Sequence, residues 1–214
     1  MSGWTAVVPV KQFALAKTRL GLPPSVRHQL SRAFVRDVLD VLTATPIVTR
    51  VVIVTAEPEL VLVARQLDAV LIEDRPTQGP DGLNPSICAG RAWAVRRAPS
   101  APLVIVPADL PALTDSTLAD ALDRLGSLPS AFIPDAAGVG TTLLASRVPQ
   151  LLTPQYGLGS SGRHAAAGAR AMSFADSRVR RDVDTQDDLA AAAQLGLGPC
   201  SRAVLASTSV AAAS

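Results

Sequence analysis

Residues 102–113, PLVIVPADLPAL, form an apolar run that ends at a single carboxylate. The β-branched residues at 104–106 have no polar residue between them, which is typical of a central strand buried on both faces. Pro107 ends this strand, because proline has no N–H to donate to a neighbouring strand. Asp109 therefore lies at the edge where open α/β sheets bind ligands. It is either a cation-binding carboxylate or the cap of the following turn.

Strands and helices alternate on both sides of this stretch. From Pro23 onward, apolar residues recur at four-residue spacing as far as Leu42, which predicts a long amphipathic helix. Residues 138–145, GVGTTLLA, indicate a glycine turn that enters a strand, expected to run antiparallel. Other strands are predicted at 4–10, 51–55, 69–73, 131–134 and 179–183, and other helices at 57–67, 84–97 and 115–125.

This alternation predicts an α/β fold, with helices on both faces of a mostly parallel sheet that has one antiparallel strand. The 214 residues suffice for one sizeable core, and no linker rich in Ser, Pro or Gly divides them. We therefore expect a single three-layer, Rossmann-like domain over residues 1–197. Residues 198–214 are expected to form a weakly structured, partly disordered C-terminal tail.

Composition excludes several classes of function. A net charge of +2 gives no reason to expect a nucleic-acid partner, and a content of 3% aromatic residues argues against a base-stacking platform for single strands. Two cysteines are too few for a disulfide framework or a zinc site, which suits a reducing compartment. No signal sequence or long apolar span is visible, so we expect no membrane association and a cytoplasmic location.

A basic loop follows the first predicted strand. It carries Lys11, Lys17 and Arg19, of which we expect Lys17 and Arg19 to be exposed. No G-x-G-x-x-G or P-loop pattern follows the strand, so side chains rather than a helix end are expected to grip phosphates there.

A second anion-binding feature is residues 156–164, YGLGSSGRH. Glycines and serines that run into a helix present backbone N–H groups to a phosphate or carboxylate. The alternative is an ordinary loop in which Ser160 or Ser161 caps the helix. Arg163 and His164 favour an anion, because a cation at a helix N-terminus is otherwise unfavourable.

Acidic residues gather in a third place, RVRRDVDTQDDL at 178–189. Thr185 and Asp188 match a capping box for the last predicted helix, while Asp182 and Asp184 precede it. With Asp109 they form two aspartate clusters that a parallel sheet would bring to one edge. Carboxylates hold Mg²⁺ through oxygen, and the ion bridges phosphate oxygens, so the pattern predicts phosphate-and-magnesium chemistry.

Asn84 is either a helix cap before Pro85 or part of a base-binding loop at residues 74–84. Nucleophilic alternatives have little support, because the chain has only two histidines and lacks a G-x-S-x-G elbow.

The chain resembles the guanylyltransferases of deazaflavin coenzyme F420 biosynthesis. The resemblance covers about residues 6–195 and rests on motifs in the same order: AVVPVKQFALAKTRL at 6–20, DGLN at 81–84, VPADLPAL at 106–113, GTT at 140–142, YGxxSSxRH at 156–164 and RRDVDTxxDL at 180–189. It implies a nucleotidyltransferase fold and the transfer of GMP from GTP to phosphoenolpyruvate or 2-phospho-L-lactate, with release of pyrophosphate. In an Ala- and Arg-rich chain of actinobacterial character, phosphoenolpyruvate is the expected acceptor.

The resemblance also implies roles for individual residues. Asp109 and Asp182 would bind the metal, and they join Lys17 and Arg19 as the catalytic set. GTP would be bound by Lys11, Lys17, Arg19, Thr55 and Asn84. The acceptor would be bound by Thr141, Gly157, Ser160, Ser161 and Arg163. Leu158 and Gly159 stand where some relatives carry Pro and Asp, so the acceptor contacts there are the least defined.

Two other classes of function remain open. A molybdopterin-type or sugar-phosphate nucleotidyltransferase would keep the basic loop and Asp109 but would not need the serine turn with Arg163. A non-catalytic nucleotide-sensing domain would not need a second metal carboxylate at Asp182. The expected partners of the guanylyltransferase are GTP, a small phospho-carboxylic acid, a downstream transferase that accepts the labile product, and a second copy of the chain in a homodimer.

Overall fold

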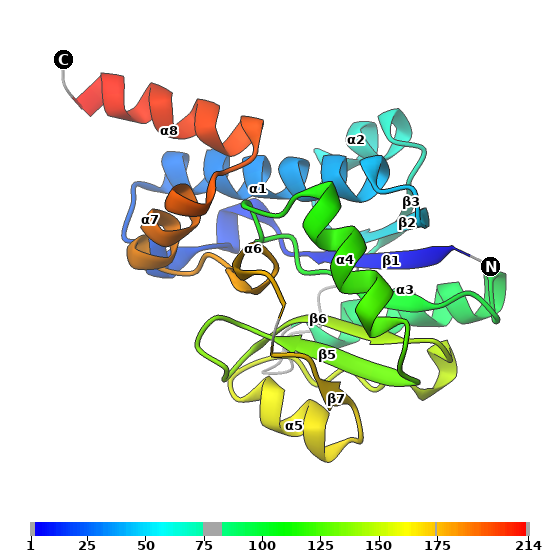
Figure 1. The fold of residues 1–214 in the computed structure, drawn as a ribbon. Coiled ribbons are helices and arrows are strands. Elements are labelled where there is room, and N and C mark those ends of the chain that lie inside the picture. Colours follow the sequence, from blue (N-terminus) through cyan, green and yellow to red (C-terminus); the bar gives the residue numbers. More distant parts are fainter. Residues whose placement is uncertain (1–2, 75–82, 174, 213–214) are drawn as a thin grey trace.

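The computed structural model describes residues 3–74, 83–173 and 175–212, in which seven strands form one sheet (Figure 1). The strands are β1 (Trp4–Val10), β2 (Val48–Thr55), β3 (Val70–Glu73), β4 (Leu103–Ile105), β5 (Ser130–Pro134), β6 (Thr141–Ser146) and β7 (Arg170–Ala171). The helices are α1 (Pro24–Ala44), α2 (Leu60–Gln66), α3 (Asn84–Arg97), α4 (Asp115–Leu125), α5 (Ser160–Ala166), α6 (Ser177–Arg180), α7 (Gln186–Leu195) and α8 (Pro199–Ala212). Short 3-10 helices are η1 (Phe13–Leu15), η2 (Thr18–Leu20) and η3 (Pro149–Leu151).

The sheet has the order β3-β2-β1-β4-β6-β5-β7. Strand β1 pairs in parallel with β2 and β4, while β6 runs antiparallel to both β4 and β5. This confirms the predicted α/β fold with a mostly parallel sheet and an antiparallel strand. The carboxyl ends of β1 and β4 therefore lie side by side, and the loops after them meet at one edge.

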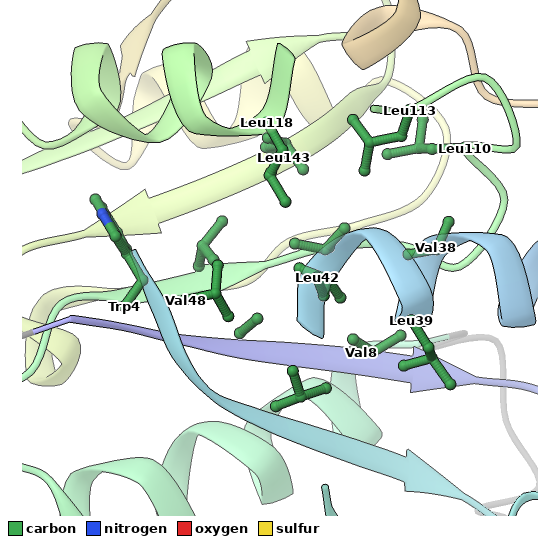
Figure 2. Packing of buried hydrophobic residues seen from close by; sticks show 14 of the residues in the cluster. Trp4, Val8, Val38, Leu39, Leu42, Val48, Leu110, Leu113, Leu118 and Leu143 are labelled. Atoms are coloured by element: carbon green, nitrogen blue, oxygen red, sulfur yellow. The ribbon is translucent and has the colours of Figure 1, made fainter. Parts of the chain in front are cut away.

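Helices cover both faces of the sheet, which gives the predicted three layers (Figure 1). On one face, Leu39 and Leu42 of α1 and Leu118 of α4 pack over Val8 and Leu143 (Figure 2). On the other face, α3 packs against the neighbouring strand positions, such as Val7 and Ile105. Central strands with both faces buried need apolar side chains at every position, which explains the unbroken run of β-branched residues.

Helix α3 approaches β1 closely because it has glycine at position 90. A Cβ atom there would lie 2.5 Å from Cγ1 of Val7 and 3.0 Å from Cγ2 of Val54. Since such distances are shorter than van der Waals contact, any larger residue would push the helix off the sheet.

The strand predicted at 179–183 is wrong. Residues 177–180 form helix α6, whose N-cap Asp176 accepts a hydrogen bond from the backbone N–H of Arg178. The β-branched residues Val179 and Val183 are buried without being in a strand, because they fill the cores beside α4 and α7. Local capping and burial thus replace the extended structure that the β-branched residues favoured.

The structure also differs from the expected weakly structured tail, since residues 199–212 form helix α8. Its start is held by the buried carboxylate of Asp37 in α1, which accepts hydrogen bonds of 2.9 Å from the N–H groups of Cys200 and Ser201. These bonds satisfy N-terminal N–H groups of the helix, and the negative charge favours its positive end. No helix among the described residues is long and apolar enough to cross a membrane.

Candidate active site

The loop after β1 places Lys17 between two carboxylates. Lys17 Nζ lies 2.7 Å from Asp109 Oδ2 and 2.9 Å from Asp184 Oδ1. Burial opposes the lysine's charge, but the two carboxylates outweigh it and raise the pKa of Lys17. The side chain of Lys17 is only 11% exposed, so the expectation of an exposed cation is wrong for it. It is right for Arg19, which is 72% exposed and lies 3.6 Å from Asp184 Oδ2.

Lys17 also has an unusual backbone conformation. Its φ and ψ are 55° and 33°, in the left-handed region that non-glycine residues rarely adopt. A conformation of this kind costs of order 1 kcal/mol and persists only where the surroundings hold it. Here the ion pairs with Asp109 and Asp184 hold the side chain at the end of the strand.

The segment between α6 and α7 brings Asp182 and Asp184 to the same place. The N–H of Val183 donates a 3.0 Å hydrogen bond to the backbone carbonyl of Asp109. This bond fastens the segment to the loop after β4, so the residues on either side of Val183 lie near Asp109. The predicted capping box is confirmed: Thr185 and Asp188 exchange hydrogen bonds with each other's backbone and start α7.

Asp182 has a strongly perturbed acidity. Burial, followed by the negative charges of Asp109, Asp184 and Asp135, raises the pKa of Asp182 to about 7. Because like charges disfavour a further carboxylate, this arrangement favours either a proton or a cation at Asp182. Oδ1 of Asp109 is buried and has no hydrogen-bond partner among the described residues. Both features fit oxygen ligands for a hard divalent cation.

These groups line a pocket of about 630 Å³ at the sheet edge. Its wall joins the β1 loop, the loop after β4, the segment between α6 and α7, and the turn before α5. Eight of the residues predicted to form the site are on it: Lys11, Lys17, Arg19, Asp109, Thr141, Gly157, Ser160 and Asp182. Thr55, Asn84, Ser161 and Arg163 are not on the wall formed by the described residues.

Residues 156–161, which we call the serine turn, form the rim of the pocket and run into the first turn of α5. Gly157 and Gly159 have φ values of 118° and 74°, which explains why glycine recurs there. Helix α5 starts after Gly159 without a side-chain cap, so the alternative role of the serines as caps is wrong. The guanidinium of Arg163 donates to the carbonyls of Gln155 and Leu158 and thereby holds the turn in shape.

Asn84 holds the other side of the serine turn. Its Oδ1 accepts a 2.7 Å hydrogen bond from the N–H of Tyr156, and its Nδ2 donates to the carbonyl of Tyr156 at 3.1 Å. Asn84 is the first residue of α3 and gives no side-chain cap, so its predicted capping role is wrong. Thr55 accepts a 2.9 Å hydrogen bond from the N–H of Glu57. Most of the predicted loop at 74–84 lies outside the described residues.

Two residues of the pocket wall that the sequence did not point to, Asp135 and Tyr156, bear on its chemistry. Asp135 accepts hydrogen bonds from the N–H groups of Val139 and Gly140 at 2.9 and 2.8 Å, which shapes the turn before β6. The hydroxyl of the half-buried Tyr156 is itself buried, and this burial together with the charge of Asp109 raises the pKa of the hydroxyl well above the ordinary value. Tyr156 belongs to the YGxxSSxRH motif, so the motif held a signal for it, whereas Asp135 had none.

The arrangement supports one kind of chemistry. Cations and acidic residues meet in one pocket, next to a turn rich in glycine and serine, which suits ligands that carry several phosphate or carboxylate groups. The part of the chain that the structure describes holds no cluster of three or more His, Cys, Asp or Glu residues able to bind a metal alone. A metal held by two carboxylates would take its remaining ligands from the substrate and water, as Mg²⁺ commonly does.

Comparison with known proteins agrees with this chemistry. The family model described as "Guanylyl transferase CofC like" matches residues 4–211. A phosphoenolpyruvate guanylyltransferase of Streptomyces scabiei is 42% identical over 210 residues, which cover 95% of this chain and 96% of the relative. The protein of the same name from Geodermatophilus obscurus is 40% identical over 209 residues, with 94% of both chains covered.

Solved structures show the same fold at low sequence identity. A protein described as a nucleotide-diphospho-sugar transferase from Desulfovibrio desulfuricans G20 superposes with a TM-score of 0.72 at 19% identity, covering 98% of this chain and 96% of that one. A 4-diphosphocytidyl-2C-methyl-D-erythritol synthase gives a TM-score of 0.61 at 13% identity, covering 91% and 99%.

Proposed function

This chain belongs to the CofC-like guanylyl transferase family, and we propose that it transfers the guanylyl group of GTP to phosphoenolpyruvate. Pyrophosphate is the second product, 2-phospho-L-lactate is the weaker acceptor, and the step belongs to the biosynthesis of the deazaflavin coenzyme F420. One observation carries the proposal. Lys17, Asp109 and Asp182 meet in a single pocket whose wall also includes the serine turn.

The reaction needs no catalytic base. The second pKa of a phosphate monoester is about 6, so the acceptor phosphate is largely a dianion at neutral pH. One of its oxygens forms a bond to the α-phosphorus of GTP, and the bond from that phosphorus to the β-phosphate oxygen breaks. The electron pair leaves with pyrophosphate. The protein therefore has to position two polyanions and offset their charge.

We assign the triphosphate to the basic loop. Lys17 and Arg19 lie beside the carboxylates, and Lys11 lies on the same wall. A pocket with three cations lowers the free energy of a bound triphosphate and of departing pyrophosphate. Thr55 and Asn84 remain our assignment for the guanine and ribose side, and both side chains already hold neighbouring backbone in place.

We assign Mg²⁺ to Asp109 and Asp182. The unpaired Oδ1 of Asp109 and the raised pKa of Asp182 support this assignment, because a divalent cation would satisfy the first and offset the repulsion around the second. When bound, the ion would neutralise phosphate charge during transfer. Asp184 keeps Lys17 and Arg19 in place beside it.

We assign the acceptor to the serine turn and Thr141. Gly157, Ser160 and Thr141 lie on the pocket wall and can donate hydrogen bonds to phosphate and carboxylate oxygens. Ser161 and Arg163 support the turn without lying on the pocket wall. The N–H of Ser161 donates to the carbonyl of Val139, and the guanidinium of Arg163 donates to the carbonyl of Gln155.

The proposal extends to the setting of the reaction. Both cysteines are free thiols, as expected in a reducing compartment, so we propose the cytoplasm. A downstream transferase would take the labile product, and a homodimer is the proposed assembly. Size-exclusion chromatography with light scattering tests the dimer, and a mass of about 22 kDa in solution would contradict it.

The test of the function is a product assay. The purified chain is incubated with Mg²⁺, one nucleoside triphosphate and one acid, and pyrophosphate and the guanylylated acid are measured. We expect release with GTP and phosphoenolpyruvate, and slower release with 2-phospho-L-lactate. The two acids differ by a planar methylene against a methyl group, so the preference should be about tenfold or less. Release with a different triphosphate, or with neither acid, contradicts the proposal.

A further inference from the structure

His164 has both ring nitrogens engaged inside the protein. It lies on α5, is 0% exposed, and packs against the rings of Phe132 and Tyr156 at centroid distances of 5.8 and 5.2 Å. Its Nε2 lies 2.9 Å from the backbone N of Gln155, and its Nδ1 lies 2.9 Å from Oγ1 of Thr141. The imidazole therefore has no free nitrogen for acid–base chemistry.

The bond with Gln155 determines where the proton of the imidazole lies. A backbone N–H can only donate, so Nε2 must be the acceptor. A neutral imidazole has one N–H, which then has to be on Nδ1. Nδ1 donates to Thr141 Oγ1, and the hydroxyl must accept. Burial and the nearby charge of Arg163 lower the pKa of His164 to about 4, so the ring stays neutral at physiological pH.

The consequence concerns the hydroxyl of Thr141, a residue that lines the pocket. A hydroxyl has one hydrogen to donate, and the ring leaves this hydrogen unused. Phosphate and carboxylate oxygens are acceptors at neutral pH, so they need a donor opposite them. If the ring instead accepted from Thr141, the hydroxyl would present a lone pair to the anion.

We propose that His164 is a positioning residue, which fixes the Thr141 hydroxyl as a hydrogen-bond donor to the anionic acceptor. This inference rests on the proposed function, because it needs an anion at Thr141. His164 does not touch the acceptor and acts through the polarity of one hydroxyl.

Two substitutions separate this role from a merely structural one. The side-chain nitrogen of His164→Asn comes near the position of Nδ1 and can donate to Thr141, while the side-chain oxygen of His164→Gln comes near the position of Nε2 and serves only Gln155. We expect His164→Gln to raise the KM for the acceptor about tenfold or more and His164→Asn to keep it within about threefold, with the KM for GTP unchanged in both. Equal acceptor KM values in the two variants would overturn the inference.

A double-mutant cycle tests the route of the effect. Thr141→Val removes the hydroxyl, so adding His164→Gln to it should raise the acceptor KM no further. If the acceptor KM of the double variant instead rose by the product of the two single increases, His164 would act by a route other than Thr141, and the inference would be overturned.

The tautomer can be read directly by long-range ¹⁵N–¹H correlation of the wild-type protein. The chain has two histidines, and the spectrum of His164→Asn assigns the signal. We expect the Nδ1–H tautomer at neutral pH. An Nε2–H tautomer or an imidazolium overturns the inference even if guanylyl transfer is observed. Absence of transfer with an Nδ1–H ring would instead overturn the proposed function.

Discussion

Lys17 Nζ lies 2.7 Å from Oδ2 of Asp109, although 92 positions separate the two residues in sequence. The pair joins the loop after β1 to the loop after β4, and Asp184 binds the same ammonium group from a third segment. One lysine thus offsets the charge of carboxylates that would otherwise repel one another. The site is held together by this charge balance as well as by the sheet.

Replacing Lys17 should therefore lower stability as well as activity. Lys17→Met has a similar side-chain length and the same cost for the left-handed backbone conformation, but it leaves Asp109 and Asp184 without their cation. We expect the free energy of unfolding to fall by about 1 to 3 kcal/mol, and added Mg²⁺ to recover part of it. Thermal unfolding with and without Mg²⁺ measures both effects.

The matched control is Arg19→Met, because Arg19 is 72% exposed and, among the described residues, makes one long ion pair. Its free energy of unfolding should stay within about 0.5 kcal/mol of wild type, while its KM for GTP rises. Equal destabilisation by the two substitutions would contradict the account of Lys17.

Two helical glycines should respond in opposite directions to the same substitution. Gly90→Ala puts a Cβ atom 2.5 Å from Val7 and should destabilise the fold by about 1 to 3 kcal/mol. In Gly162→Ala of α5, the new Cβ atom has no described atom within 4 Å, and the substitution should stabilise the fold by up to about 1 kcal/mol, because alanine favours helix. Chemical denaturation measures both, and a gain from Gly90→Ala would contradict the packing of α3 on β1.

Acid should destabilise the protein through His164. Its pKa is about 4 in the folded state against about 6.5 when unfolded, so the unfolded chain binds the extra proton. The stability is complete above pH 6.5 and is lost as the pH falls toward 4. Between about pH 7 and pH 5 the loss from this residue should be about 2 kcal/mol.

The measurement is the free energy of unfolding of wild type and His164→Asn across this pH range. The variant lacks the titrating group, so the difference in the free energy of unfolding between the two proteins should shrink by about 2 kcal/mol from about pH 7 to pH 5. A difference that does not change with pH would show that the ring titrates normally in the folded protein.

The order of elements could be predicted from the sequence because buried strands and amphipathic helices have distinct apolar periods. The run at 104–106 and the spacing from Pro23 to Leu42 indicated β4 and α1 in this way. Helix α8 could not be predicted, because its start depends on the carboxylate of Asp37, which is 163 positions from Cys200. The local sequence of α8 has only a weak helical pattern, and a residue far away in the chain stabilises its first turn.

The site could be predicted in part for a similar reason. Asp109 could be predicted, because the sequence shows where the buried strand before it ends. Asp182 reaches the pocket through the hydrogen bond between Val183 and the carbonyl of Asp109, and no local pattern reveals such a bond. The burial of Lys17 depends on the same long-range contacts. Sequence could therefore name the charged residues but not their pairing.

The central claim is that Asp182 belongs to a metal-dependent guanylyl transfer site, and Asp182→Asn tests it most directly. This substitution removes a charge that burial and three neighbouring carboxylates already disfavour, so the Tm without Mg²⁺ should be no lower than in wild type. Pyrophosphate release should fall about 100-fold or more, and the rise in Tm on adding Mg²⁺ should disappear. Asp187→Asn, an exposed residue of α7, is the control and should behave as wild type. Wild-type rates of pyrophosphate release from Asp182→Asn would contradict the account.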